Sequence, residues 1–127
     1  MNEPEKVMDT RLPVPYDLDA LLELYRDSLD VLNEILAIFR EETPGKIDKL
    51  ERAVGEEQWS LVAHIAHSLA NTTGTLRADR GLQLSRATER ASRAEEGPRV
   101  RELAALLISE LGHIAEVIAA YQKRNRT

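Results

Sequence analysis

Cysteine is absent from this chain of 127 residues, and aromatic residues are scarce: one Trp, one Phe and three Tyr. The absence of cysteine excludes a disulfide framework and thiolate chemistry. With so few aromatic side chains, the core must be built from Leu, Ile, Val and Ala, which favours packed helices. No apolar run reaches the length of about 18 residues that a membrane-spanning helix needs, so we expect no membrane span.

Positive charge is also in short supply. The formal net charge is −5, and the sequence has no basic stripe of the kind that binding to a nucleic-acid backbone requires. The first fifteen residues lack the apolar core of a signal peptide. We therefore expect no nucleic-acid partner and a cytoplasmic location. The length suits one domain with one core.

What the sequence does contain is apolar residues at helical spacing, with no alternating strand pattern to compete. The spacing predicts helices over residues 18–26, 29–55, 58–76, 79–97 and 98–123. Short connections between long amphipathic helices imply antiparallel neighbours. The predicted fold is therefore all-α: an up-and-down antiparallel four-helix bundle with a short additional N-terminal helix. We expect the bundle over 16–123, a flexible N-terminal arm over 1–15, which holds three prolines, and a tail over 124–127.

Local signals mark the helix ends. Asp17 and Asp79 can cap the helices that follow them, as can Ser28 or Asp27. Pro98 fits the first turn of the last helix. Pro44 falls inside the pattern of a long helix, where proline removes a hydrogen bond, so we expect a kink or a short break near Glu42–Pro44.

His67 stands out in a stretch without charge, since Ser60 to Leu76 contains no Asp, Glu, Lys or Arg. On a helix, Val62, Ile65 and Leu69 gather on one face, and His67 points about 180° away from it. The neighbours expected on that exposed side are small: Ala63, Ala70, Asn71 and Gly74. Because an exposed helix face normally carries charges, a histidine ringed by small uncharged residues indicates a place where a partner docks.

These residues resemble a known family. From about Asp17 to Tyr121 the chain is similar to the histidine-containing phosphotransfer (HPt) domains of phosphorelays. The family signature resembles His-x-Leu-Lys-Gly followed by small residues, and the matching stretch here begins His67-Ser68-Leu69-Ala70-Asn71. Upstream residues that fit the family pattern are Leu36-Ala37-Ile38-Phe39, Pro44, Leu50, Ala53, Trp59 and Ala66. The segment from Leu84 to Ala91, with Glu89, looks like the family's next helix.

The resemblance implies a phosphoryl carrier without catalytic activity of its own. His67 would accept a phosphoryl group from a receiver-domain aspartate or a kinase and pass it to another receiver domain. The implied partners are a response-regulator receiver domain, a hybrid histidine kinase, or both. The receiver would supply Mg²⁺, so the chain itself needs no cofactor. The residues expected to dock the phosphoryl group or the partner are Ala63, His64, Ala70, Asn71, Gly74 and Arg77. With polar outer faces, a monomer is the default expectation.

Three positions depart from the family pattern. Where the family has Lys three positions after the histidine this chain has Ala70, and where the family has Gly four and ten positions after it, this chain has Asn71 and Arg77. Without the Lys, the charge of the phosphoryl group must be neutralised from elsewhere or go unmet, and Arg77 or Arg80 could provide the positive charge. All the same, the arginines of this region fit a solvated face better than a site: Arg77, Arg80, Arg86, Arg90 and Arg93. An HPt-like adaptor that binds a receiver or kinase without being phosphorylated therefore remains an alternative.

Two histidine pairs raise the question of a metal site. His64-x-x-His67 has the spacing of half a site, but its helix has no Asp or Glu to complete the ligand set. His64 is then either a solvated residue or a hydrogen-bonding neighbour of the phosphoryl group. Glu110-x-x-His113 matches half of a di-iron motif, which needs a second pair and two more glutamates. We expect both residues on the surface and no metal site.

Overall fold

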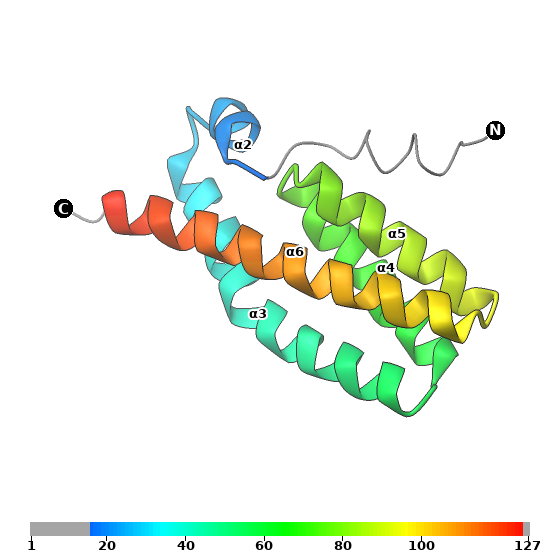
Figure 1. Ribbon diagram of the computed structural model, residues 1–127. Coiled ribbons are helices and arrows are strands. Elements are labelled where there is room, and N and C mark those ends of the chain that lie inside the picture. Colours follow the sequence, from blue (N-terminus) through cyan, green and yellow to red (C-terminus); the bar gives the residue numbers. More distant parts are fainter. Residues whose placement is uncertain (1–15, 126–127) are drawn as a thin grey trace.

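The computed structural model describes residues 16–125, and this part of the chain forms five helices and no strand (Figure 1). The helices are α2 (Asp19–Leu24), α3 (Leu29–Gly55), α4 (Trp59–Thr75), α5 (Asp79–Arg93) and α6 (Gly97–Arg124). The prediction of an all-α protein with a short additional helix is confirmed. The expected arm over 1–15 and the end of the expected tail lie outside the described residues.

Aliphatic side chains fill the space between the helices, as the shortage of aromatic residues predicted. Each long helix turns its apolar stripe inward, and burying one such side chain contributes about 1.5–3 kcal/mol. Among the aromatic residues, Phe39 and Tyr16 belong to the core and Trp59 packs against it. The largest fully buried side chains are Leu21, Leu32, Leu36, Leu50, Val62, Leu69, Leu76, Val100, Leu107, Leu111, Ile114 and Ile118.

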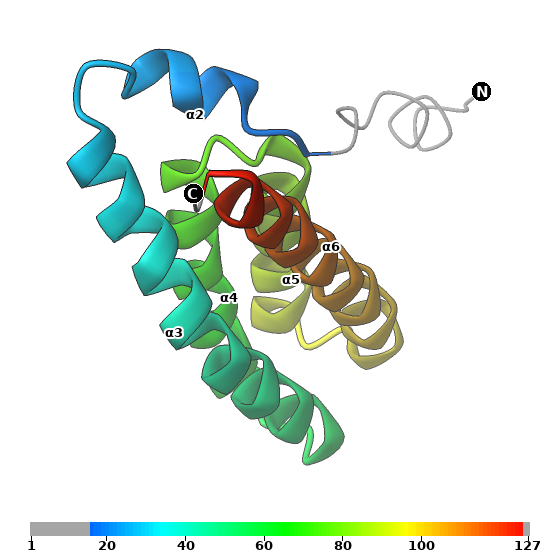
Figure 2. The ribbon, with the colours of Figure 1, turned by 90° about the vertical axis from the view of Figure 1, so that its left-hand side faces the viewer.

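The four long helices pack around this core as a closed ring. α3 contacts α4 and α6, and α5 contacts the same two helices. Figure 2 shows the ring with α2 lying outside it at one end. Arg40 of α3 donates a hydrogen bond of 2.6 Å to Gln122 of α6 and so links two helices that are far apart in the sequence.

Tyr16 ties the start of the described chain to the connection between α4 and α5. Its hydroxyl donates a hydrogen bond of 3.0 Å to the backbone oxygen of Leu76. Burial, together with the nearby Asp17 carboxylate, raises the pKa of Tyr16 above its ordinary value. The phenol therefore keeps its proton at any physiological pH and remains a hydrogen-bond donor.

Helix α3 runs without interruption through Pro44, so the break considered from the sequence does not occur. Pro44 is exposed, and its missing N–H costs the helix one hydrogen bond. Phe39, Thr43 and Leu50 on both sides of it are buried in the same stripe. Packing on the core therefore holds the two halves of α3 together.

The helix ends agree with the sequence signals to within a few residues, except that α5 ends at Arg93 and not at Gly97. The N-cap of α2 is Leu18 and not Asp17 as predicted, although Asp17 accepts a hydrogen bond of 2.9 Å from the backbone N–H of Asp19. Asp79 is the first residue of α5 and makes no capping bond. Pro98 lies in the first turn of α6, as predicted.

Helix α6 is long and apolar enough, by length and composition alone, to cross a membrane. Its apolar stripe, from Val100 to Ile118, is buried in the bundle. Core packing therefore accounts for the apolar stripe of α6. The sequence contains no uninterrupted run of about 18 apolar residues, yet a window of this helix passes the composition test for a membrane span.

The three connections between the long helices share one backbone geometry. In each, a residue with positive φ follows the helix: Glu57 (55°), Arg77 (58°) and Glu95 (56°). After α4, the N–H of Arg77 bonds to the oxygen of Gly74 and the N–H of Ala78 to that of Thr73, which is the Schellman pattern. Glycine is favoured at this position because any residue with a Cβ is strained at positive φ.

This geometry generates a stability prediction for Arg77→Gly. Removing the Cβ at a positive φ should raise the free energy of unfolding by about 1 kcal/mol, measured by urea denaturation. Arg52→Gly is the matched control, because Arg52 lies within α3 and a helical glycine should lower stability by about 1 kcal/mol. Loss of stability in Arg77→Gly would show that the arginine side chain makes a contact more important than the backbone strain.

Candidate functional site

His67 lies in the middle of α4 with its side chain 60% exposed. The opposite face of α4 carries Val62, Ile65 and Leu69 into the core. The predicted orientation of His67, away from the apolar stripe, is therefore confirmed.

The small residues expected around His67 on the exposed side do not all lie there. Ala63 is fully buried and Ala70 is only 8% exposed, because α5 packs along this side of α4. Asn71 is exposed and Gly74 is half-buried. The expectation of an open rim of small residues was thus wrong for the two alanines, whose small size instead lets α5 come close to His67.

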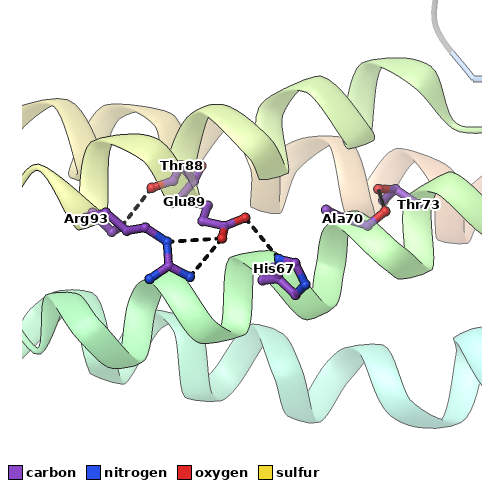
Figure 3. Close-up of polar contacts among 7 residues, drawn as sticks. His67, Ala70, Thr73, Thr88, Glu89 and Arg93 are labelled. Atoms are coloured by element: carbon purple, nitrogen blue, oxygen red, sulfur yellow. Dashed lines mark hydrogen bonds and ion pairs between the residues drawn. The ribbon is translucent and has the colours of Figure 1, made fainter.

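Glu89 of α5 reaches His67 across this interface (Figure 3). Its Oε1 lies 3.3 Å from Nδ1 of His67, and its Oε2 accepts hydrogen bonds from Nε (3.2 Å) and Nη2 (2.9 Å) of Arg93. The Glu89 side chain is 19% exposed, whereas His67 and Arg93 are both largely exposed. One carboxylate thus holds the imidazole with one oxygen and a guanidinium with the other.

The charge of Glu89 is stabilised by these contacts. Burial raises the pKa of its carboxyl, but the hydrogen bonds and charges of Arg93 and His67 outweigh burial, so the pKa lies below its ordinary value. Glu89 is therefore ionised at neutral pH, and its Oε1 accepts a hydrogen bond from the N–H group at Nδ1 of His67. In a neutral imidazole this assigns the proton to Nδ1 and the lone pair to Nε2. Figure 3 shows the second ring nitrogen directed away from Glu89.

A hollow opens beside His67 between α4 and α5. Its lining consists of His67, Ala70, Asn71, Arg86, Glu89, Arg90 and Arg93. Three of these residues are arginines of α5, which the sequence suggested only as a solvated face. Their spacing of four and three residues places them on one side of the helix, and this spacing was the signal that could have identified them.

The two arginines that the sequence offered as sources of positive charge lie elsewhere. Arg77 occupies the connection between α4 and α5 and does not line the hollow. Arg80 is directed toward α6, where its Nε lies 3.8 Å from a carboxylate oxygen of Glu110. The predicted docking residue His64 is exposed and also lies outside the lining of this hollow.

A second, apolar groove lies on the other side of His67, between α3 and α4. Asn71 lines both this groove and the arginine-lined hollow, so it stands on the ridge between them. Ile38, one of the lining residues, is 53% exposed. Lys46 donates a hydrogen bond of 3.3 Å to Oγ1 of Thr72 at the groove. The lining residues are Ile35, Ile38, Phe39, Glu42, Thr43, Lys46, Asn71, Thr72, Thr75 and Leu76.

Within residues 16–125, no group of three or more His, Asp or Glu side chains is placed to hold a metal ion. The surface position expected for Glu110 was wrong: it is 8% exposed, and its Oε2 has no hydrogen-bond partner in this part of the chain. His113 is half-buried, with Nε2 likewise unpartnered. Helix α5 packs against α6, and Arg80 of α5 lies 3.8 Å from Oε1 of Glu110, so a neighbouring helix contributes to the burial of Glu110.

Comparison with known proteins agrees with the resemblance noted from the sequence. The family model described as Hpt domain matches residues 34–120, which is more than half of the chain and includes His67, Glu89 and most of the four long helices. Neither a search of curated proteins nor a search of solved structures gave a match. Hpt domains are phosphocarrier modules of two-component signalling that work with receiver domains and kinases. On the extent of this match, the chain belongs to the Hpt domain family.

Proposed function

We propose that this protein is a histidine phosphotransfer protein that accepts a phosphoryl group on His67 and passes it to a receiver domain. The donor is a receiver-domain aspartate or a hybrid histidine kinase. The carrier is a cytoplasmic monomer, built as an up-and-down antiparallel four-helix bundle, with no catalytic activity of its own. The observation that carries this proposal is the contact between Glu89 and Nδ1 of an exposed histidine, which leaves Nε2 available to react.

The chemistry follows from this tautomer. The lone pair on Nε2 attacks phosphorus, a P–N bond forms, and the bond between phosphorus and the donor's aspartate oxygen breaks. The electron pair of that bond leaves with the aspartate carboxylate. The ring keeps its proton on Nδ1 and becomes positively charged, and the ionised Glu89 stabilises that charge in the manner of a carboxylate that orients a histidine. The partner receiver supplies the Mg²⁺ that neutralises charge on the phosphoryl oxygens.

The site has an open approach, as transfer between two proteins requires. His67 projects from the surface of α4, so a donor can reach Nε2 in line. The apolar groove between α3 and α4 lies next to it and shares Asn71 with the hollow at His67. An amphipathic helix of the receiver laid in this groove would bury Ile38 and bring its active site to His67.

Replacing His67 by Gln should abolish phosphoryl acceptance while leaving the bundle folded, because glutamine suits an exposed helix position but has no nucleophilic nitrogen. The measurement is transfer of label from receiver domains phosphorylated with acetyl phosphate and Mg²⁺, scored as acid-labile, alkali-stable label. Label on the variant at another histidine would contradict the site. A wild-type protein that binds receivers but takes no label would support the adaptor alternative.

Glu89→Gln should shift the imidazole toward the tautomer with the proton on Nε2 and slow acceptance by about tenfold, less than the loss of a general acid or base, because Glu89 orients the ring without taking its proton. The tautomer is measured by ¹⁵N NMR of His67. Glu116→Gln is the control, since Glu116 is exposed on α6 and away from the site. If the tautomer were the same in the variant and the wild type, the proposed role of Glu89 would be wrong.

The same variant has a pH signature. The folded pKa of Glu89 is depressed, so its stabilising effect is present above the ordinary pKa of 4.5 and is lost as pH falls through the folded value. The unfolding free energies of wild type and Glu89→Gln should therefore differ at neutral pH and converge below pH 4.5. The difference should stay under about 1 kcal/mol because the partners of Glu89 are exposed.

Ile38→Asp should weaken receiver binding and slow transfer by about tenfold, because it places a charge in the apolar groove. Leu106→Asp is a matched control: Leu106 is 51% exposed, nearly the same as Ile38, but lies on α6. Transfer rates at limiting receiver concentration check the pair. Equal effects of the two substitutions would exclude the α3–α4 groove as the docking surface.

A further inference from the structure

The hollow beside His67 holds more positive charge than its own residues neutralise. Three arginines and one glutamate line it, which leaves an excess of two positive charges in a chain whose formal net charge is −5. Glu89 pairs with Arg93. Within residues 16–125, neither Arg86 nor Arg90 forms an ion pair.

Such an excess of like charge slightly destabilises the folded protein unless an anion binds nearby. Like charges held on one side of a helix at a spacing of four residues destabilise the helix by a few tenths of a kcal/mol. A phosphoryl group carries about −1.5 to −2 charges at pH 7. Since the phosphorylated ring carries one positive charge, phosphorylation of His67 adds a net charge of about −0.5 to −1 and so lowers the positive excess of the hollow.

Geometry assigns different tasks to the three arginines. Arg93 is held by two hydrogen bonds to Glu89, on the Nδ1 side of the imidazole. Nε2 is directed away from Glu89 (Figure 3). Arg86 and Arg90 line the same hollow as Ala70 and Asn71, with no carboxylate to hold them. A guanidinium can give two parallel hydrogen bonds to phosphoryl oxygens, which a lysine cannot.

Building on the proposed function, we infer that Arg86 and Arg90 of α5 bind the phosphoryl group carried on Nε2 of His67. They take the place of the positive charge missing at Ala70. Arg93 acts as a positioning residue: it holds Glu89, which in turn holds the ring. The charge that stabilises the phosphorylated state thus comes from α5 and not from the helix that carries the histidine.

The experiment starts from protein phosphorylated chemically with phosphoramidate, which transfers its phosphoryl group to histidine and releases ammonia. The pH midpoint of the phosphoryl titration is then read by ³¹P NMR. Bound guanidinium groups favour the dianion, so Arg86→Ala/Arg90→Ala should raise the midpoint by about half a pH unit or more, as expected for two exposed ion pairs. Arg86→Lys/Arg90→Lys keeps the charge and should give an intermediate midpoint.

Arg52→Ala is the control, since Arg52 is exposed on α3 and also forms no ion pair within the described residues. It should leave the midpoint unchanged. The Nε resonances of Arg86 and Arg90, but not of Arg52, should shift on phosphorylation. An equal midpoint in wild type and the double alanine variant, or an equal shift in Arg52→Ala, would overturn the inference.

The test separates this inference from the proposed function. Suppose that receivers phosphorylate His67 but the pH midpoint of the phosphoryl titration is the same with and without the two arginines. This result would support the carrier function and contradict the arginine site. Suppose instead that the two arginines shift the midpoint in chemically phosphorylated protein, but no receiver transfers label to His67. This result would support the arginine site and contradict the carrier function. Failure of phosphoramidate to label His67 would count against both.

Discussion

The close packing of α4 against α5 is the constraint on which the candidate site depends. Gly81 of α5 lies so near α4 that a Cβ there would meet Cγ2 of Thr73 at 2.9 Å. Ala63 and Ala70 are buried on the α4 side of the same interface. Because small residues occupy these positions, the helices come close enough for a carboxylate on α5 to touch an imidazole on α4. The small residues around the histidine therefore serve the geometry between two helices more than they serve an open surface.

Threonine residues in this interface form their hydrogen bonds within their own helix and not with the neighbouring helix. Thr73 donates to the backbone oxygen of Leu69 (2.8 Å), and Thr88 to that of Leu84 (2.7 Å). Their hydroxyls are satisfied within their own helix, so the interface is held by shape and burial. The contact of Glu89 with His67 lies at the exposed edge of this interface. Substitutions in the site can thus change its chemistry at little cost to the fold.

Much of the fold could be predicted from the sequence because helical periodicity and turn signals are local. The end of α3 at Gly55, the place of Pro98 and the outward direction of His67 all follow from spacing along one helix. What could not be predicted depends on which helices become neighbours. The periodicity of α4 alone could not show that α5 covers Ala63, and that of α6 alone could not show that Glu110 is buried. The pairing of Glu89 with His67 has the same origin, since the two residues lie on different helices.

The three departures from the family pattern have separate physical explanations. Position 77 has a left-handed backbone, so a glycine there serves the turn, and Arg77 affects the connection more than the chemistry. Position 71 is exposed on the ridge between the hollow and the groove, where a side chain larger than glycine has room. Position 70 is buried against α5, so a lysine there would have to extend into the hollow that the α5 arginines already line. The positive charge that the family pattern places on the helix of the histidine is thus found, in this chain, on the neighbouring helix α5, whose three arginines line the hollow beside His67.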